Sequence, residues 1–395
     1  MKRFFYILFL GAVCHINGQQ NFEVGKLIDS IPVSNTTDET FALYLPSSFD
    51  ASQTSPILFI FDPVGRGRIG VETFMEVAEN YGFILVCSNN SRNAPYERNF
   101  NIAANLFDHI FSRFTVDDKQ MYLAGFSGGS RLAWAIAVAA GNIRGVIACG
   151  AGFSEAPSPL LKKQELSYAG IIGNRDMNYG EMLEVKAYLT KANYDNTLFI
   201  YEGDHNWPPP RVIARAFNWL DVAAHKKGAK VKAEAELYKS YTDDYNIAVK
   251  SESSGNTLQA AAEYERILST YGSLYALDTV SARLSRLTKD STYKRALKAR
   301  SKALAEEKEW TAILYRQFIT DYEQPEKLDM AWWVKILSQL NAKYAKATEE
   351  FQNMLERVKF NLLAQAFSRK NPLLFNPTEA QKRFCNELGQ LIYSD

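Results

Sequence analysis

Short apolar segments alternate with amphipathic ones along the first half of the chain. Apolar or strictly alternating runs predict strands, and apolar residues three and four positions apart predict helices. Strands are expected at 40–45, 56–61, 82–87, 120–124, 143–149, 168–172 and 197–201, and helices at 72–81, 101–114, 131–140, 179–191 and 210–225. This alternation predicts an α/β fold with a mostly parallel sheet. The half-polar pattern of 40–45 favours an antiparallel strand at one edge.

The pattern changes after the basic segment at 226–230, and residues 231–395 show helical spacing with almost no strand-like runs. We therefore expect an α/β domain over 22–225 and an all-helical domain over 231–395. A small residue precedes an aromatic one by four positions in Ala260/Tyr264, Thr311/Tyr315, Ala347/Phe351 and Ala380/Phe384. The last two aromatic spacings, 36 and 33 residues, are close to the tetratricopeptide period of about 34. Tetratricopeptide-like helix pairs and a non-repeating bundle both fit this pattern.

The N-terminus has the pattern of a secretory signal peptide, with a basic start and an apolar run at 4–13. That run is shorter than the roughly 20 residues that a membrane-spanning helix needs. Removal of residues 1–18 would give a secreted or periplasmic protein. The residues before Cys14 form a poor lipobox, so a lipid anchor is not expected.

The composition limits the classes of protein that fit. The 395 residues are 47% apolar with a net charge of +1, which excludes wholesale disorder and argues against nucleic-acid binding driven by bulk charge. The length suits two or three domains. Cleavage of the signal would leave three cysteines, too few for a disulfide framework. The chain has no zinc-type spacing and no phosphate-binding glycine loop, so no metal or cofactor is expected.

The segment Gly125-Phe126-Ser127-Gly128-Gly129 matches the GxSxG pattern of a nucleophile elbow. A predicted strand precedes it and an apolar helix follows it, as the strand–turn–helix of an elbow requires. The flanking glycines keep side chains out of a crowded turn, and the helix N-terminus supplies positive potential. Ser127 is therefore the predicted nucleophile, with a helix-capping serine as the structural alternative.

A serine hydroxyl needs a base, and the chain has four histidines. His15 belongs to the signal segment, His109 lies on an inward helix face, and His225 ends a helix, where a dipole interaction accounts for it. His205 follows a late strand and precedes Trp207 and a proline run. We predict His205 as the general base.

The acid that orients the base is expected after a strand. Asp176 follows the strand at 168–172 and gives the chain order serine, aspartate, histidine of the α/β-hydrolases. Glu155 and Asp204 are the alternatives, although Asp204 adjoins His205 in sequence and could hardly reach its ring.

The oxyanion hole is expected to combine the backbone N–H of Gly128 with one from the loop after 56–61. Pro63 has no N–H, so Val64 is the predicted second donor. Arg66 and Arg68 could meet an anionic substrate or remain solvated. Trp207 is a candidate substrate-binding residue, with a structural loop as the equal alternative.

These segments together resemble the α/β-hydrolase superfamily over about 22–225. Gly125–Gly129, Gly173–Asp176 and the Trp-Pro pair after His205 are similar to the secreted polyhydroxybutyrate-depolymerase and feruloyl-esterase group. The resemblance implies cofactor-free ester hydrolysis by Ser127, Asp176 and His205. The chain departs from that group by carrying Asp62-Pro63 where a His-Gly oxyanion loop is common.

The leading hypothesis is a secreted serine carboxylesterase acting on a small-molecule or polymer-linked ester. An inactive hydrolase-fold scaffold that binds a protein partner through its helical domain is the alternative from another class. A serine peptidase acting on short peptides is the third hypothesis, because the same triad serves amides.

Overall fold

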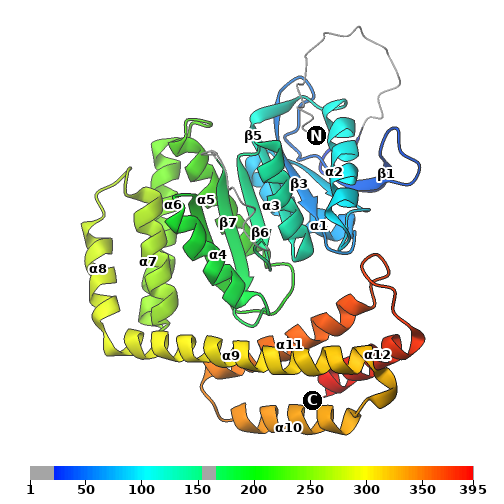
Figure 1. Cartoon of the computed structure of the whole chain (residues 1–395). Coiled ribbons are helices and arrows are strands. Elements are labelled where there is room, and N and C mark those ends of the chain that lie inside the picture. The colour runs from blue at the N-terminus through cyan, green and yellow to red at the C-terminus, as the bar shows by residue number, and fades with distance from the viewer. Residues whose placement is uncertain (1–21, 154–165, 395) are drawn as a thin grey trace.

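The computed structural model describes residues 22–153 and 166–394. The predicted signal segment and Glu155 therefore lie outside the described residues. An eight-stranded sheet and its helices make up residues 22–226, here called the sheet region, and helices make up residues 234–394, here called the helical region (Figure 1). These regions correspond to the two predicted units, whose independence as domains stays a prediction.

The strands are β1 (Leu27–Pro32), β2 (Thr40–Tyr44), β3 (Ser55–Phe61), β4 (Ile84–Ser88), β5 (Val116–Phe126), β6 (Gly145–Cys149), β7 (Ser167–Gly173) and β8 (Asp195–Tyr201). Their order in the sheet is β1-β2-β4-β3-β5-β6-β7-β8. Pairs among β3 to β8 are parallel, and β2 is antiparallel to both β1 and β4. This confirms the predicted α/β class with a mostly parallel sheet and an antiparallel strand at 40–44. The edge itself is β1, which the pattern did not predict, and β2 lies between β1 and β4.

Two helical layers cover the sheet. The helices are α1 (Gly67–Tyr81), α2 (Tyr96–Phe111), α3 (Gly128–Ala140), α4 (Tyr179–Lys191) and α5 (Pro210–Lys226). Side chains alternate between the two faces of each strand, so Ile57 and Phe59 pack under α2, α3 and α4 while Leu58 and Ile60 pack under α1 and α5. Both faces of the sheet are buried, which explains why its strands are nearly continuous apolar runs.

The helical region contains α6 (Glu234–Ser253), α7 (Thr257–Tyr271), α8 (Asp278–Lys289), α9 (Ser291–Glu323), α10 (Met330–Tyr344), α11 (Glu349–Arg369) and α12 (Glu379–Ser394), with a short 3₁₀ helix, η1, at Pro325–Lys327. Two apolar clusters hold it together. One joins α6, α7 and α8 to the end of α5, and the other joins α9, from Ala303 onward, to α10, α11 and α12. The 33 residues of α9 extend about 50 Å and connect the two clusters.

The four small/aromatic pairs behave differently from one another. Ala260 and Tyr264 are fully buried in α7, whereas Tyr315 of α9 is 40% exposed. A uniform repeat would bury equivalent positions in the same way, and α9 is much longer than its neighbours. The tetratricopeptide-like arrangement stays a prediction.

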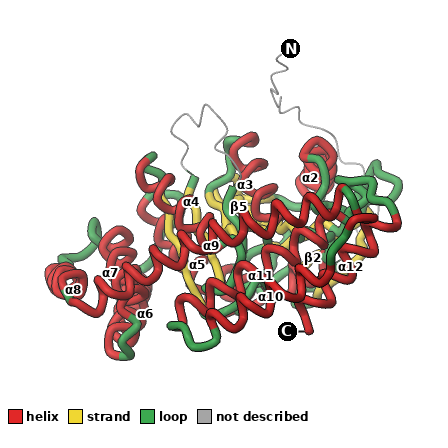
Figure 2. Tube along the Cα trace, turned by 60° about the horizontal axis from the view of Figure 1, so that its bottom comes forward, coloured by secondary structure: helices red, strands yellow, loops and turns green. Residues whose placement is uncertain are grey.

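Helices α9 and α11 lie across one end of the sheet, at the lower side of Figure 1, and α9, α10 and α11 lie in front of the strands in Figure 2. Leu304 of α9 packs against the apolar cluster of the sheet region. This is the end at which the parallel strands finish, so the helical region covers the edge where the predicted site residues gather.

Candidate active site

Three of the predicted site residues follow the carboxyl ends of parallel strands. Ser127 comes directly after β5, Asp176 three residues after β7, and His205 four residues after β8. Because β5, β6, β7 and β8 are parallel neighbours, their carboxyl ends meet at one edge of the sheet. The topology therefore brings together residues that are 29 to 78 positions apart in the chain.

Ser127 occupies the strained turn between β5 and α3. Its backbone has φ 53° and ψ −120°, a conformation in which a non-glycine residue is disfavoured. The N–H of Ser127 donates to the carbonyl of Cys149 at 2.8 Å, which anchors the turn to β6. Side chains on Gly125 or Gly129 would overlap neighbouring backbone atoms, so the tight turn requires both glycines. The predicted strand–turn–helix is present.

The hydroxyl of Ser127 lies 2.9 Å from Nε2 of His205, and Nδ1 of His205 lies 2.8 Å from Oδ2 of Asp176. Asp176 is buried, and its other oxygen accepts the N–H of Asn178 at 2.9 Å. The carboxylate thus favours the tautomer with its proton on Nδ1, which leaves Nε2 to accept the serine proton. The structure brings the three residues into one hydrogen-bonded chain.

The alternatives to Asp176 and His205 have other partners. Asp204 pairs with Nε of Arg175 at 2.6 Å. His109 is buried in α2, where its Nδ1 accepts the N–H of Ser34 at 3.0 Å. Nδ1 of His225 accepts the N–H of Lys232 at 3.2 Å in the last turn of α5. Each of these contacts has a structural role away from Ser127.

Two aromatic rings flank the imidazole of His205. Phe126 of β5 lies 4.7 Å from it between ring centroids, and Phe360 of α11 lies 5.3 Å from it. Only 9% of the histidine side chain is exposed. The helical region thus shields the candidate base from water on one side.

Sequence reasoning missed Phe360. It lies 155 residues beyond His205, and the helical spacing around it predicts only a helix. The nearby pattern of apolar residues gives no sign of which helix covers the strand ends, so no sequence signal identifies this contact.

Arg357, one turn earlier on α11, joins the helical region to the loop that carries Asp176. Its Nη1 donates to the carbonyl of Asn174 at 2.7 Å, and its Nε donates to Glu307 of α9 at 2.8 Å. The guanidinium also lies 4.8 Å from the centre of the Tyr179 ring. Arg357 is only 1% exposed, and burial raises the pKa of Glu307 despite this ion pair. A buried cation therefore fixes the backbone two residues before Asp176.

The loop after β3 is organised around the buried carboxylate of Asp62. Its Oδ1 accepts the N–H of Val64 at 2.9 Å, and its Oδ2 accepts Nη2 of Arg66 at 2.8 Å. The prediction of Val64 as the second oxyanion donor needs correction, because this N–H is already used within the loop. Arg66 likewise pairs with Asp62, and Arg68 lies beside Glu72 and Asp29, so both charges are balanced by nearby carboxylates.

The indole of Trp207 belongs to the same loop system. Its N–H donates to Oδ2 of Asp62 at 3.1 Å, and its ring packs against Phe126 and Phe74. Asp62 and Trp207 thus tie the loop after β3 to the loop that carries His205. These contacts fit the structural alternative for Trp207, and a contact between Trp207 and a substrate stays a prediction.

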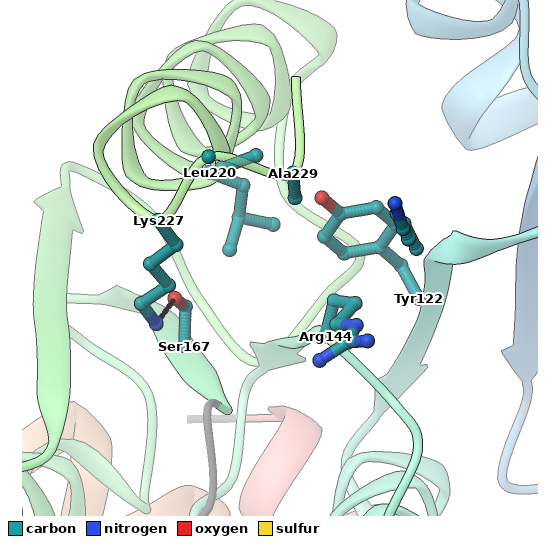
Figure 3. Close-up of a pocket in the computed structure, with 9 residues that line it drawn as sticks. Tyr122, Arg144, Ser167, Leu220, Lys227 and Ala229 are labelled. Carbon is teal, nitrogen blue, oxygen red and sulfur yellow. Dashed lines mark hydrogen bonds between the residues drawn. The ribbon is translucent and has the colours of Figure 1, made fainter.

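A separate cavity of about 140 Å³ lies at the other end of the strands, beside the carboxyl end of α5 (Figure 3). Its lining includes Tyr122, Arg144 and Lys227, and Lys227 donates to the hydroxyl of Ser167 at 2.7 Å. Ser167 begins β7, whereas Asp176 follows its end. This cavity is therefore remote from Ser127 and is no part of the candidate site.

The three described cysteines are free and buried. Burial raises the pKa of Cys87, Cys149 and Cys385, that of Cys385 to about 11. Their thiols are therefore poor nucleophiles at neutral pH. Within residues 22–153 and 166–394, no cluster of side chains suits a metal ion, and no helix is both long and apolar enough to span a bilayer.

No known family model matches the sequence, and no curated protein matches it. Solved structures of several hydrolases are similar to about half of the chain. A Staphylococcus aureus fluorophosphonate-binding serine hydrolase is 15% identical, with 50% of this chain and 99% of that chain covered and a TM-score of 0.42.

Two esterases give comparable matches. The feruloyl esterase module of Clostridium thermocellum is 14% identical, with 48% of this chain and 85% of that chain covered and a TM-score of 0.40. Esterase 2 of Thermogutta terrifontis is 12% identical, with coverages of 53% and 98% and a TM-score of 0.40. Each of these likenesses extends over about half of the chain.

Proposed function

We propose that this protein is a serine hydrolase that cleaves a carboxylic ester through an acyl-enzyme. One observation carries the proposal: the hydrogen-bonded chain from Ser127 through His205 to the buried Asp176, built on a strained strand-to-helix turn. A serine hydroxyl becomes an effective nucleophile when it is hydrogen-bonded to a base and that base is oriented by a carboxylate.

In the first half of the reaction, Oγ of Ser127 attacks the ester carbonyl carbon while Nε2 of His205 takes the hydroxyl proton. The carbonyl π electrons move to oxygen, and the N–H of Gly128, the first residue of α3, donates to that oxyanion. Asp176 stabilises the imidazolium. When the intermediate collapses, the C–O bond to the alcohol breaks and His205 returns its proton to the leaving oxygen.

In the second half, a water molecule loses a proton to His205 and attacks the acyl carbon. The ester bond to Ser127 breaks, the proton returns to Oγ, and the acid product leaves. No step requires a metal ion or cofactor. We also propose export of the protein, on the signal-like pattern of its first 18 residues, and a small or polymer-linked ester as substrate.

The test combines fluorophosphonate labelling with the turnover of short p-nitrophenyl esters. We expect one adduct on Ser127 in the folded protein and none after heat denaturation. Ser127→Ala should lose labelling and reduce ester turnover by about 10⁴-fold or more. Unchanged turnover in that variant would refute the assignment.

Two further outcomes separate the other hypotheses. A folded protein that neither labels nor turns over any ester would favour the inactive scaffold. Faster cleavage of matched p-nitroanilide peptides than of esters would favour a peptidase.

A further inference from the structure

The proposed oxyanion hole lacks a second donor in the loop that normally supplies it. Pro63 has no N–H. The backbone N–H groups of Val64 and Arg66 donate to Oδ1 of Asp62 at 2.9 and 3.2 Å. The N–H of Gly65 donates to the backbone carbonyl of Asp62 at 3.3 Å. Every N–H from 63 to 66 is therefore absent or engaged inside the loop. A donor from another segment must face the oxyanion beside Gly128, or Gly128 acts alone.

The side chain of Asn93 lies against Gly128. A Cβ on Gly128 would overlap Oδ1 of Asn93 and would lie 3.5 Å from its Nδ2. A side chain at position 128 would therefore displace this amide. The contact places a side-chain amide next to the residue whose N–H begins α3, which is the proposed first oxyanion donor.

The backbone of Asn93 is held in place from two sides. Its N–H donates to the carbonyl of Pro63 at 2.7 Å, which joins it to the loop after β3. Its carbonyl accepts Nδ2 of Asn371, in the segment after α11, at 2.7 Å. The helical region thus helps to fix the backbone that carries this amide.

The amide of Asn93 is available to a ligand. Asn93 is exposed, and within the described part of the chain its side chain makes no hydrogen bond. Rotation about the bond to the amide exchanges the positions of Oδ1 and Nδ2, because this torsion is broad and roughly two-fold. A negative oxygen beside Gly128 would favour the orientation with the NH₂ group toward it.

We propose that the side-chain amide of Asn93 is the second oxyanion donor, and that Asn371 is its positioning residue in the helical region. This inference rests on the proposed function. As the carbonyl π electrons move to oxygen, Gly128 N–H and Asn93 Nδ2–H both donate to it. The amide is neutral and exchanges no proton, so the balance of the reaction is unchanged.

The test follows two reactions of the full-length protein: turnover of p-nitrophenyl acetate, measured as kcat and KM, and fluorophosphonate labelling, measured as a second-order rate constant. The phosphonyl oxygen of the probe gains negative charge in the same hole as Ser127 attacks phosphorus, so labelling reports on Asn93 even without a good ester. Asn93→Ala should lower both rates by about 10²- to 10³-fold, mainly in kcat. Asn93→Asp, nearly the same in shape, should be at least as slow because it presents a carboxylate to the oxyanion.

Asn371→Ala should lower kcat roughly 3- to 10-fold with little change in KM, because it removes one hydrogen bond that positions the backbone of Asn93. Asn101→Ala and Asn376→Ala, both at exposed asparagines nearby in sequence, should leave both rates unchanged. Far-UV circular dichroism checks that each variant folds.

Rates of both Asn93 variants within threefold of the wild type would overturn the proposal, while the loss of labelling in Ser127→Ala would still support the serine hydrolase. Failure of the folded wild type to label or turn over esters would overturn both.

Discussion

The sheet region and the helical region contribute to the candidate site in different ways. The sheet region supplies Ser127, Asp176 and His205, each a few residues beyond a strand end. The helical region supplies no member of this hydrogen-bonded chain. It contacts the site through Arg357, Phe360 and Asn371, which touch an Asp176-loop carbonyl, the imidazole and the Asn93 carbonyl respectively. The positions of the reacting groups thus follow from strand order, whereas part of their surroundings comes from a distant part of the chain.

The contacts between the two regions also differ in strength. Arg357, a buried cation paired with Glu307 inside the helical region, donates to the Asn174 carbonyl of the sheet region, whereas Lys308 of α9 and Glu184 of α4 form an exposed ion pair at 2.8 Å. A buried charge cannot lose its partner without a large cost, and an exposed pair is screened by water. Variants at Arg357 and Lys308 should therefore differ in their loss of stability.

The largest expected effect on stability comes from Arg357→Met. The change would leave the carboxylate of Glu307 and the carbonyl of Asn174 buried without their donor, at a cost of about 3–5 kcal/mol. Urea denaturation followed by tryptophan fluorescence measures the free energy of unfolding. The double variant Arg357→Met/Glu307→Gln should recover part of the loss, because the buried carboxylate that paired most closely with Arg357 is then a neutral amide.

Lys308→Met is the matched control, since Lys308 also joins the helical region to the sheet region, through its ion pair with Glu184. Its pair is exposed on both sides, so the loss should stay below about 1 kcal/mol. Equal losses for the arginine and lysine variants would show that burial of Arg357 does not strengthen the contact between the regions.

A smaller effect is expected from Phe360→Ala, which removes the helical region's contact with the candidate base. Loss of one ring contact should lower kcat/KM for p-nitrophenyl esters roughly 3- to 10-fold. Phe367→Ala on the same helix removes a ring that is 63% exposed and should leave kcat/KM unchanged. Equal kcat/KM for the wild type and Phe360→Ala would show that the ring contact from the helical region does not contribute to catalysis.

The smallest effect is expected from His109→Asn, which tests a histidine of the sheet region far from the reaction. Burial, and secondarily the positive charge of Arg113, lowers the pKa of His109 below its ordinary value. The unfolded chain therefore gains a proton near pH 6.5 that the folded protein resists, and stability falls as pH decreases through that range.

In the His109→Asn variant, Oδ1 can replace Nδ1 as the acceptor for Ser34. The wild type should thus lose more stability than this variant between pH 7.5 and pH 5.5, as measured by urea denaturation at both values. Parallel losses in the two proteins would contradict a lowered pKa for His109.

Local pattern predicted most strands and helices, but not where several of them begin. The helix predicted at 72–81 begins at Gly67, because Oδ1 of Asn89, from the next strand's loop, accepts the N–H of Gly67 at 2.9 Å. The strand predicted at 120–124 extends from Val116 to Phe126 because β3 and β6 pair with it on both sides. Such ends are set by partners that lie elsewhere in the sequence.

The candidate site was likewise predictable in part from local pattern and in part only from tertiary contacts. The GxSxG segment, the strand ends and the histidine count were sufficient to select Ser127, Asp176 and His205, which the structure brings together. Val64 was selected because Pro63 lacks an N–H, and the structure instead gives that N–H to Asp62. The pattern identified the loop but could not show that its own carboxylate would take up its donors.

The sequence by itself determined the α/β class, the strand-end positions of the reacting groups and the elbow that carries Ser127, because these depend on local periodicity, glycine and chain order. Only the tertiary structure decided that α9 and α11 cross the strand ends, that Phe360 covers His205 and that Asn93 lies against Gly128. These contacts join segments that are far apart in the chain, and the apolar pattern of a helix shows that it packs without showing against what.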